Sequence, residues 1–342
     1  MFFKLKSTFS SILFATLLVL IHPSIKAQDK IGGLQIEDIP FLKKNPKKMK
    51  LVKKLWKTSL KNATKVYKEL KLEKENKGEF NFLGRLKYVN GVGFKTKNPY
   101  FPRYVEKYKT LSKLKYPLPK VKLEYELDQD KKTITYYNQE IITKWFSNLN
   151  SDKSVCAFKF LGSGERDYKL KSFKNAEEAK KAGYIITHRY KCGTCSSLKD
   201  LAIYIAMPDL TDPVRNCSKK LTLNMTKKCL IKDVGFSEHC VESWAYNGDH
   251  TKKRCIGTCI KQYGLINLIT NNMQGSNVDK DGNLKPCIAC DEYKSGPGFK
   301  YTAARTRRWS GLKSAIPRSK DEIFHVNHFK YFKEMKSWEW FD

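Results

Sequence analysis

The sequence predicts an α+β fold in which a small, disulfide-stapled C-terminal α+β domain follows a basic, largely helical N-terminal region. Short β-like runs alternate with helical patterns through the second half of the chain. The N-terminus is typical of an export signal, and an even number of cysteines in an exported chain indicates a disulfide framework. All ten cysteines lie between residues 156 and 290: Cys156, Cys192, Cys195, Cys217, Cys229, Cys240, Cys255, Cys259, Cys287 and Cys290.

Residues 1–27 have the layout of a secretory signal peptide. Lys4 and Lys6 form a basic start, an apolar run follows from Ile12, and Ala27 precedes the expected cleavage site. The apolar run is shorter than the ~20 residues that span a bilayer, which disfavours the alternative of an uncleaved anchor. We therefore expect a secreted protein, or a periplasmic one in a bacterium, without a transmembrane helix.

The region over residues 28–120 is expected to be basic and mostly helical. Asn45 and Pro46 predict a helix start, and apolar residues from Leu51 to Leu70 recur at helical spacing with lysines between them. Such a helix can contact an anionic membrane surface, but its apolar stripe more often docks on its own domain. A cysteine-rich α+β domain over 121–330 and a C-terminal tail over 331–342 complete the predicted organisation.

The elements of the cysteine-rich domain follow from changes in periodicity. Alternating residues on either side of Asp128 predict a hairpin, and Asn175 is typical of a helix cap. The predicted strands cover 157–161, 168–173 and 184–190. The predicted helices cover 176–182, 197–207, and shorter segments around 221–234 and 241–246.

The chain is strongly basic, with 66 Lys and Arg against 34 Asp and Glu and a formal net charge of +32. Such a charge attracts an anionic small molecule, a polyanion or an anionic membrane surface. The lysine excess equally fits an AT-rich coding genome and a solvated surface. No recognised nucleic-acid motif is present, so we expect no sequence-specific nucleic-acid binding.

An arginine cluster follows the last cysteine pair and is the leading candidate binding site. Guanidinium groups match carboxylate, sulfate or phosphate with paired hydrogen bonds, and an indole can stack on a ligand or on an arginine. The ligand-binding residues predicted on this basis are Arg305, Arg307, Arg308, Arg318 and Trp309. The alternative is an exposed basic loop. The main prediction is therefore a secreted, monomeric protein that binds an anionic ligand or polymer through these arginines.

The segment from Cys192 to Cys195 lies between a predicted strand and a predicted helix, and it supports two alternative functions. At a helix N-terminus the positive end of the helix dipole lowers the pKa of a cysteine thiol and so stabilises the thiolate. One alternative is a thiol–disulfide oxidoreductase in which Cys192 attacks and Cys195 resolves. The other is a hydrolase or transferase with Cys195 as nucleophile, His188 or His328 as base, and Asp200 orienting the base. A structural disulfide role is the most common one for exported cysteines.

The sequence Cys192-Gly193-Thr194-Cys195 resembles the papain-like Cys-Gly-[Ser/Ala]-Cys signature. In that family the second cysteine is the nucleophile, so the resemblance implies this role for Cys195 and a base role for His328, at a suitable separation. The resemblance covers only these residues. Ser196 stands where the family has an aromatic residue, and we interpret the match as accidental.

Two further kinds of site are suggested by short motifs. Asn277, Asp279 and Asp281 fit the first ligand positions of an EF-hand calcium loop, but Ile288 replaces its bidentate glutamate and a tight Asp-Gly turn explains the segment equally well. We expect no other cofactor. Acceptor motifs for N-glycosylation, relevant in a eukaryotic host, begin at Asn62, Asn216 and Asn224.

Overall fold

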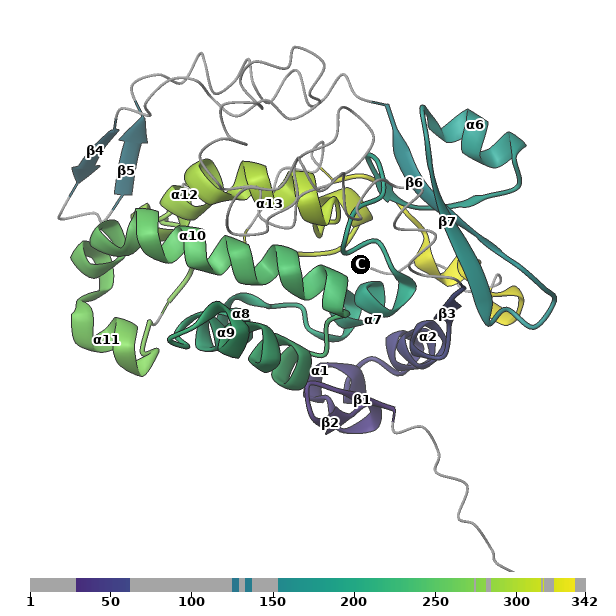
Figure 1. Ribbon diagram of the computed structural model, residues 1–342, viewed down its shortest axis with the longest axis horizontal. Helices are drawn as coiled ribbons and strands as arrows, with labels where there is room; N and C mark the ends of the chain where they lie inside the picture. Colours follow the sequence, from purple (N-terminus) through teal and green to yellow (C-terminus); the bar gives the residue numbers. More distant parts are fainter. Residues whose placement is uncertain are drawn as a thin grey trace, which may run out of the picture.

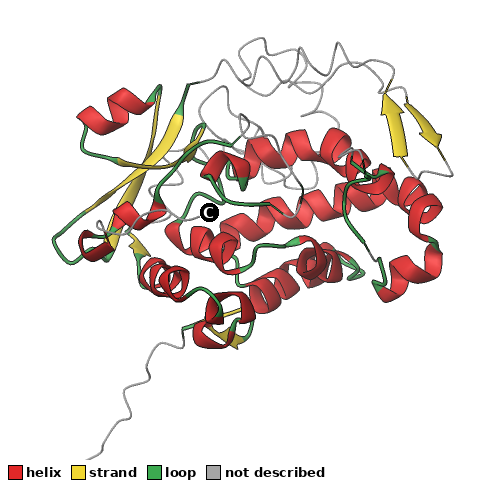
Figure 2. Cartoon of the chain, turned by 180° about the vertical axis from the view of Figure 1, so that it is seen from behind, coloured by secondary structure: helices red, strands yellow, loops and turns green. Residues whose placement is uncertain are grey.

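The computed structural model describes residues 29–61, 125–128, 133–136, 153–273, 275–280, 284–314, 316 and 323–335. It has the mixed α+β architecture that the sequence predicts, with the largest sheet at one end and helices forming most of the rest (Figure 2). The predicted signal peptide, most of the basic region over 28–120 and the last residues of the chain lie outside the described residues.

A four-stranded sheet forms one end of the molecule (Figure 1). Its order is β3 (Ser59–Leu60), β7 (Asp167–Phe173), β6 (Val155–Phe160) and β8 (Ile185–Arg189). Strand β6 is antiparallel to both β7 and β8, whereas β3 runs parallel to β7. In β7, Tyr168 and Leu170 are buried whereas Lys169 and Lys171 are exposed, as a sheet with one covered face requires. The three strands predicted in this region are confirmed.

Helix α6 (Ala176–Lys181) connects β7 to β8 and begins at the predicted cap. The side chain of Asn175 accepts a hydrogen bond of 2.9 Å from the backbone N–H of Glu178. Separately, β4 (Tyr125–Asp128) and β5 (Thr133–Tyr136) pair in antiparallel register, which confirms the predicted hairpin.

The helical part is arranged around α10 (Glu238–Tyr263), which is 26 residues long and far exceeds the short helix predicted there. Ser237 caps its N-terminus and Gly264, with a φ of 83°, ends it. The other helices are α7 (Leu198–Ala206), α8 (Thr211–Ser218), α9 (Leu223–Cys229), α11 (Leu265–Thr270), α12 (Pro286–Cys290) and α13 (Gly296–Ala303).

The described N-terminal helices, α1 (Pro40–Lys43) and α2 (Pro46–Trp56), belong to the same hydrophobic core as the cysteine-rich domain. Leu51, Val52 and Leu55 are almost fully buried where α2 packs against α7. The apolar stripe of α2 therefore covers its own domain and is not open to a membrane. Tyr331 and Met335, in the predicted tail, are also core residues.

All ten cysteines form disulfides, which confirms the predicted framework. One bond joins β6 to the loop after β8, another joins that loop to α10, and a third joins α8 to α9. Two more fasten α12 to α10. The pairs are Cys156–Cys192, Cys195–Cys240, Cys217–Cys229, Cys255–Cys290 and Cys259–Cys287. Among the helices described, none has the length and apolar character needed to cross a bilayer.

Candidate functional site

The loop between β8 and α7 contains the predicted cysteine site and is locked against the end of α13. The backbone N–H groups of Thr194 and Cys195 donate to the carbonyls of Thr302 and Ala303, at 2.9 and 3.1 Å. A Cβ atom on Gly193 would lie 2.5 Å from the Thr302 carbonyl oxygen, so only glycine fits this close approach. The loop is a buried joint between two parts of the fold.

The disulfide pattern corrects both cysteine-based alternatives. An oxidoreductase needs Cys192 and Cys195 to bond to each other, but they bond to Cys156 and Cys240. A nucleophile needs a free thiol in reach of substrate, but Cys195 is fully buried in its disulfide. Both hypotheses are wrong because each cysteine has a nearer partner from another element, a contact that the spacing of the motif does not reveal.

The histidines predicted as bases are also buried and have structural partners. His188 places Nε2 2.8 Å from Ser196 Oγ and Nδ1 2.7 Å from the Arg189 carbonyl oxygen. His328 places Nε2 2.6 Å from the Ser310 carbonyl oxygen. Burial holds the pKa of His188 well below its usual value and lowers the pKa of His328 to about 3. Both imidazoles are therefore neutral parts of the core.

Asp200 joins two helix starts instead of orienting a base. Its carboxylate accepts hydrogen bonds from the hydroxyls of Ser197 and Ser237, at 2.5 and 2.7 Å, and from the Ser237 backbone N–H at 2.9 Å. Burial raises the pKa of this carboxyl. Because Ser197 and Ser237 cap α7 and α10, Asp200 fixes the relative position of the two helices.

The structure divides the predicted arginine cluster. Arg305 is fully buried and donates to the carbonyl oxygens of Cys195 at 2.8 Å and Ser196 at 3.1 Å, and to the hydroxyl of Ser310 at 3.2 Å. It therefore does not contact a ligand, which corrects that prediction. Trp309 is equally buried, with its ring 4.4 Å from that of Tyr190. Arg318 lies outside the described residues.

Arg307 and Arg308 line a groove of about 370 Å³ that runs beside α10. Helix α8 forms one side, and α12, α13 and the segment after α13 form the other. Its lining is largely apolar. The apolar and aromatic members are Tyr204, Pro208, Leu210, Val214, Trp244, Ile256, Tyr263, Leu268, Met273, Ile288, Phe299 and Ile316.

Cationic side chains outnumber acidic ones around this groove. The six cations are Arg215, Lys219, Lys252, Lys300, Arg307 and Arg308, against Asp209, Asp291 and Glu292. Arg307 is anchored by Nη1, which donates to the Tyr204 carbonyl oxygen at 2.7 Å. On α8, burial and the neighbouring Arg215 lower the pKa of Lys219, so an anion bound here would relieve repulsion between two cations.

Two of the three acidic members, Asp291 and Glu292, lie on the α12 side. Asp291 accepts a short hydrogen bond from the Thr251 hydroxyl, and Glu292 pairs with Lys300 at 2.8 Å. Burial raises the pKa of Asp291 to about 6, and the neighbouring Glu292 adds to the rise. Asp291 therefore changes charge near neutral pH inside the groove. The sequence did not predict this acidic site. The feature that could have indicated it is the Asp-Glu pair directly after Cys290.

The remaining predicted sites are placed as follows. Asn277 and Asp279 lie on either side of Val278, which forms a bridge with Leu284. Asp281 is outside the described residues, so the calcium site stays a prediction. Asn216 and Asn224 are exposed on α8 and α9, and Asn62 lies outside the described residues.

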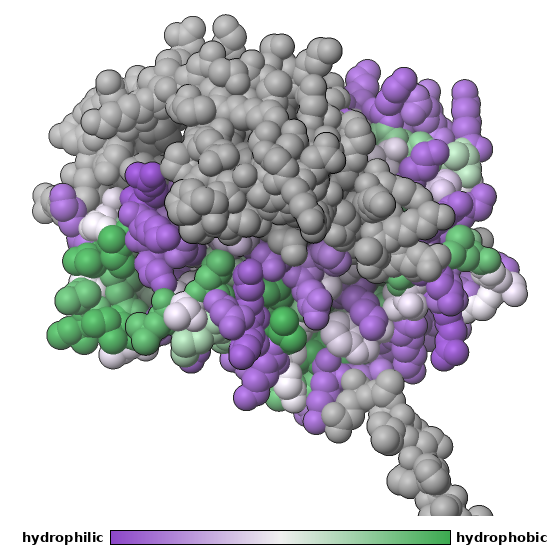
Figure 3. All heavy atoms as spheres, in the orientation of Figure 1, coloured by the Kyte–Doolittle hydropathy of each residue, from purple (hydrophilic) through white to green (hydrophobic). Residues whose placement is uncertain are grey.

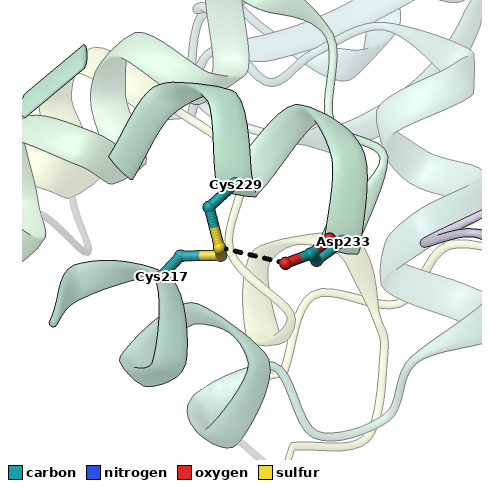
Figure 4. Close-up of side chains that lie close together, drawn as sticks. All are labelled: Cys217, Cys229 and Asp233. Carbon is teal, nitrogen blue, oxygen red and sulfur yellow. Dashed lines mark hydrogen bonds between the residues drawn. A yellow bond between two sulfur atoms is a disulfide. The ribbon is translucent and has the colours of Figure 1, made fainter. Parts of the chain in front are cut away.

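One group within the described part of the chain has the spacing of metal ligands: Cys217, Cys229 and Asp233 (Figure 4). The two cysteines are bonded to each other, and the carboxylate of Asp233 lies 3.2 Å from Cys229 Sγ. A disulfide sulfur offers no thiolate to a metal. This group is therefore a covalent staple with an acidic neighbour.

Comparison with known proteins assigns no activity. Residues 224–326 match a family described as a family of unknown function (DUF8771). These residues include α10, α12, α13 and most of the groove lining. No curated protein and no solved structure matches the chain.

The disulfide assignment gives a direct prediction. Native, unreduced protein should incorporate no iodoacetamide, and peptide mapping should return the five pairs described above. Mass spectrometry before and after reduction measures both. Alkylation of Cys195 in the folded protein would contradict the assignment and restore the nucleophile hypothesis.

Proposed function

We propose that this disulfide-rich protein of extracellular type binds a small anionic ligand with an apolar portion in the groove beside α10. The observation that supports the proposal is the excess of cations around a largely apolar lining. An apolar ligand portion is favoured by burial against such walls. A carboxylate, sulfate or phosphate group is favoured by charge-assisted hydrogen bonds from lysine and arginine. In this proposal the cations of the groove contact the anionic group, a role that the sequence-based prediction gave to Arg305 among others.

The construction of the groove supports binding without large rearrangement. The disulfide between Cys259 and Cys287 lies in its wall, and the one between Cys255 and Cys290 fastens the same two helices one turn away. The ring of Trp244, on α10, packs against that of Phe299, on α13, with centroids 4.5 Å apart. A site held in this way loses little conformational freedom on binding, which favours affinity.

The proposal is tested with 1-anilinonaphthalene-8-sulfonate, a fluorescent probe that carries one sulfonate on an apolar ring system. We expect saturable binding that the double variant Lys219→Gln/Lys252→Gln weakens about 3- to 10-fold, or about 0.6–1.4 kcal/mol. Both lysines are exposed at the groove and donate only to surface carbonyl oxygens, and equal thermal unfolding of the variant and the wild type checks that the fold is unchanged. Lys253→Gln is the matched control, because Lys253 is exposed beside Lys252 but pairs with Asp249 outside the groove lining.

Competition separates the two kinds of anionic ligand. Decanoate should displace the probe, whereas inorganic phosphate, which lacks an apolar portion, should displace it poorly. A sulfated polysaccharide that binds with a steep salt dependence, unaffected by the double variant, would indicate general attraction to a chain of charge +32. Equal probe affinity in wild type, double variant and control would refute the groove as the site.

The charge of Asp291 gives the same experiment a pH dependence. Its pKa of about 6 means that it is mostly neutral at pH 5 and ionised at pH 7.5. The sulfonate probe stays ionised at both values, so we expect it to bind several-fold more tightly at pH 5. Asp291→Asn removes the titrating charge and should bind tightly at both pH values. A variant that keeps the pH dependence of the wild type would exclude Asp291 as its source.

A further inference from the structure

Helix α11 and the adjoining end of α10 form an apolar tip that is exposed in this structure. Leu265, Ile266 and Ile269 have exposed fractions of 55, 76 and 66%, and α11 has no buried residue. On α10, Ile256 and Ile260 are 45 and 36% exposed. Figure 3 shows this apolar surface at the end of the molecule where Figure 1 labels α11. Five exposed aliphatic side chains this close together are typical of an interaction surface.

The tip is held in a defined position. The side-chain amide of Asn267 donates to the Tyr263 carbonyl oxygen at 2.8 Å, which ties α11 back to α10. Lys219 Nζ donates to the Ile269 carbonyl oxygen at 3.0 Å, which ties the other end of α11 to α8. The disulfide between Cys259 and Cys287 lies one turn before the end of α10. The apolar side chains are therefore presented by a supported hairpin of helices.

The chain segment that forms the tip carries charge of one sign. Residues 250–278 contain no aspartate or glutamate. The same stretch carries four cations, Lys252, Lys253, Arg254 and Lys261, all on α10 and all exposed. Lys219 and Lys220 at the end of α8 add two exposed cations on the neighbouring side. An apolar surface with a basic surround complements a layer that is apolar inside and anionic at its surface.

We infer that this tip, defined by Ile256, Ile260, Leu265, Ile266 and Ile269, docks on an anionic lipid surface. The aliphatic side chains enter the boundary between head groups and acyl chains, while the surrounding lysines contact lipid phosphates and carboxylates. A second copy of this chain is a poor occupant, because each copy carries a net charge of +32 and presents cations at the tip. The inference does not depend on the ligand proposed for the groove.

The location differs from the one that the sequence suggests. The basic amphipathic helix over residues 46–56 buries its stripe against α7, whereas α11 is too short and too little basic to stand out as a membrane helix. Ile256 and Leu268 of this region also line the groove. One end of the groove is therefore next to the proposed lipid surface.

The test is co-sedimentation of the full mature chain with vesicles of phosphatidylcholine alone and of phosphatidylcholine with phosphatidylserine. We expect binding to the anionic vesicles only, weakened by raised salt. The variant Ile266→Ser/Ile269→Ser should lose about tenfold or more in vesicle binding. Leu161→Ser is the control, because Leu161 is 50% exposed in the β6–β7 turn at the other end of the molecule. Equal thermal unfolding of all variants shows that the fold is intact.

Three outcomes would overturn the inference. The first is binding of the Ile266→Ser/Ile269→Ser variant equal to that of the wild type. The second is equal binding of the wild type to neutral and anionic vesicles, which would show that the lysines play no role. If the lysines do contact the lipid, Lys261→Glu should weaken binding to anionic vesicles. The third is concentration-dependent self-association that the serine variant abolishes, with no vesicle binding by the wild type. That result would identify a second copy as the occupant.

Discussion

Arg305→Met is expected to lower the free energy of unfolding by about 3–5 kcal/mol. The guanidinium of Arg305 donates to the Cys195 carbonyl, the Ser196 carbonyl and the Ser310 hydroxyl in a fully buried setting. Methionine fills a similar volume but leaves the two carbonyl oxygens without donors. Each buried acceptor left unsatisfied costs about 1–3 kcal/mol. Relief of the buried charge offsets only part of this loss.

Urea unfolding of the oxidised protein measures the effect of Arg305→Met. Arg305→Lys should rescue little, because a lysine ammonium cannot reproduce the planar fork that reaches three acceptors. Arg254→Met is the control, since Arg254 is exposed on α10, and it should change the free energy of unfolding by less than about 0.5 kcal/mol. Wild-type stability in Arg305→Met would mean that the buried guanidinium is dispensable.

Acidification from pH 6.5 to pH 4 is expected to destabilise the protein by about 3 kcal/mol through His328, and protonation of His188 adds to the loss in the same direction. Burial lowers both pKa values in the folded state, to about 3 for His328, whereas an unfolded histidine titrates near 6.5. Between these values the unfolded chain binds more protons, so stability is complete above pH 6.5 and falls as the pH falls. Asp291 acts in the opposite direction, because its raised pKa favours the folded state below about 6, and it offsets part of the loss.

The variant His328→Gln isolates one histidine. Between pH 4 and 6 its free energy of unfolding should depend on pH less steeply than that of the wild type, by about 1.4 kcal/mol per pH unit. Denaturant titrations at several pH values give this slope. The matched control is His325→Gln, since His325 is exposed three residues away, and its slope should equal that of the wild type. Identical slopes for both variants would show that His328 is not the source.

Local signals predicted much of the sheet and its neighbouring helices. Asn175 caps α6 as expected, because an Asx side chain at a helix start satisfies a backbone N–H within its own turn. Dependence on local signals also explains why the length of α10 was not predicted. The apolar residues of α10 do not form a continuous stripe at helical spacing. Its second half is instead held against α12 by the disulfides of Cys255 and Cys259. The helix is therefore defined by partners far along the chain.

The predicted roles of the candidate site residues were wrong for a related reason. Four arginines close together in sequence suggest a ligand site, but Arg305 finds its carbonyl acceptors 109 and 110 residues earlier in the chain. Nothing in the local sequence distinguishes this arginine from Arg308, which lines the groove. The groove itself is formed by α8, α10, α12 and α13, and its shape depends on how those helices pack. Residue spacing therefore did not indicate which of the arginines line the groove.

The covalent network covers only part of the fold. Its five bonds all lie between Cys156 and Cys290, whereas α2 and the segment around Met335 join the core by packing and by contacts such as the 2.9 Å ion pair between Lys54 and Glu334. The molecule thus consists of a cross-linked frame and a removable cover. Opening the cover breaks no covalent bond. It would uncover the face of α7, while the tip and the groove walls on α8, α10 and α12, which lie within the frame, keep their connections.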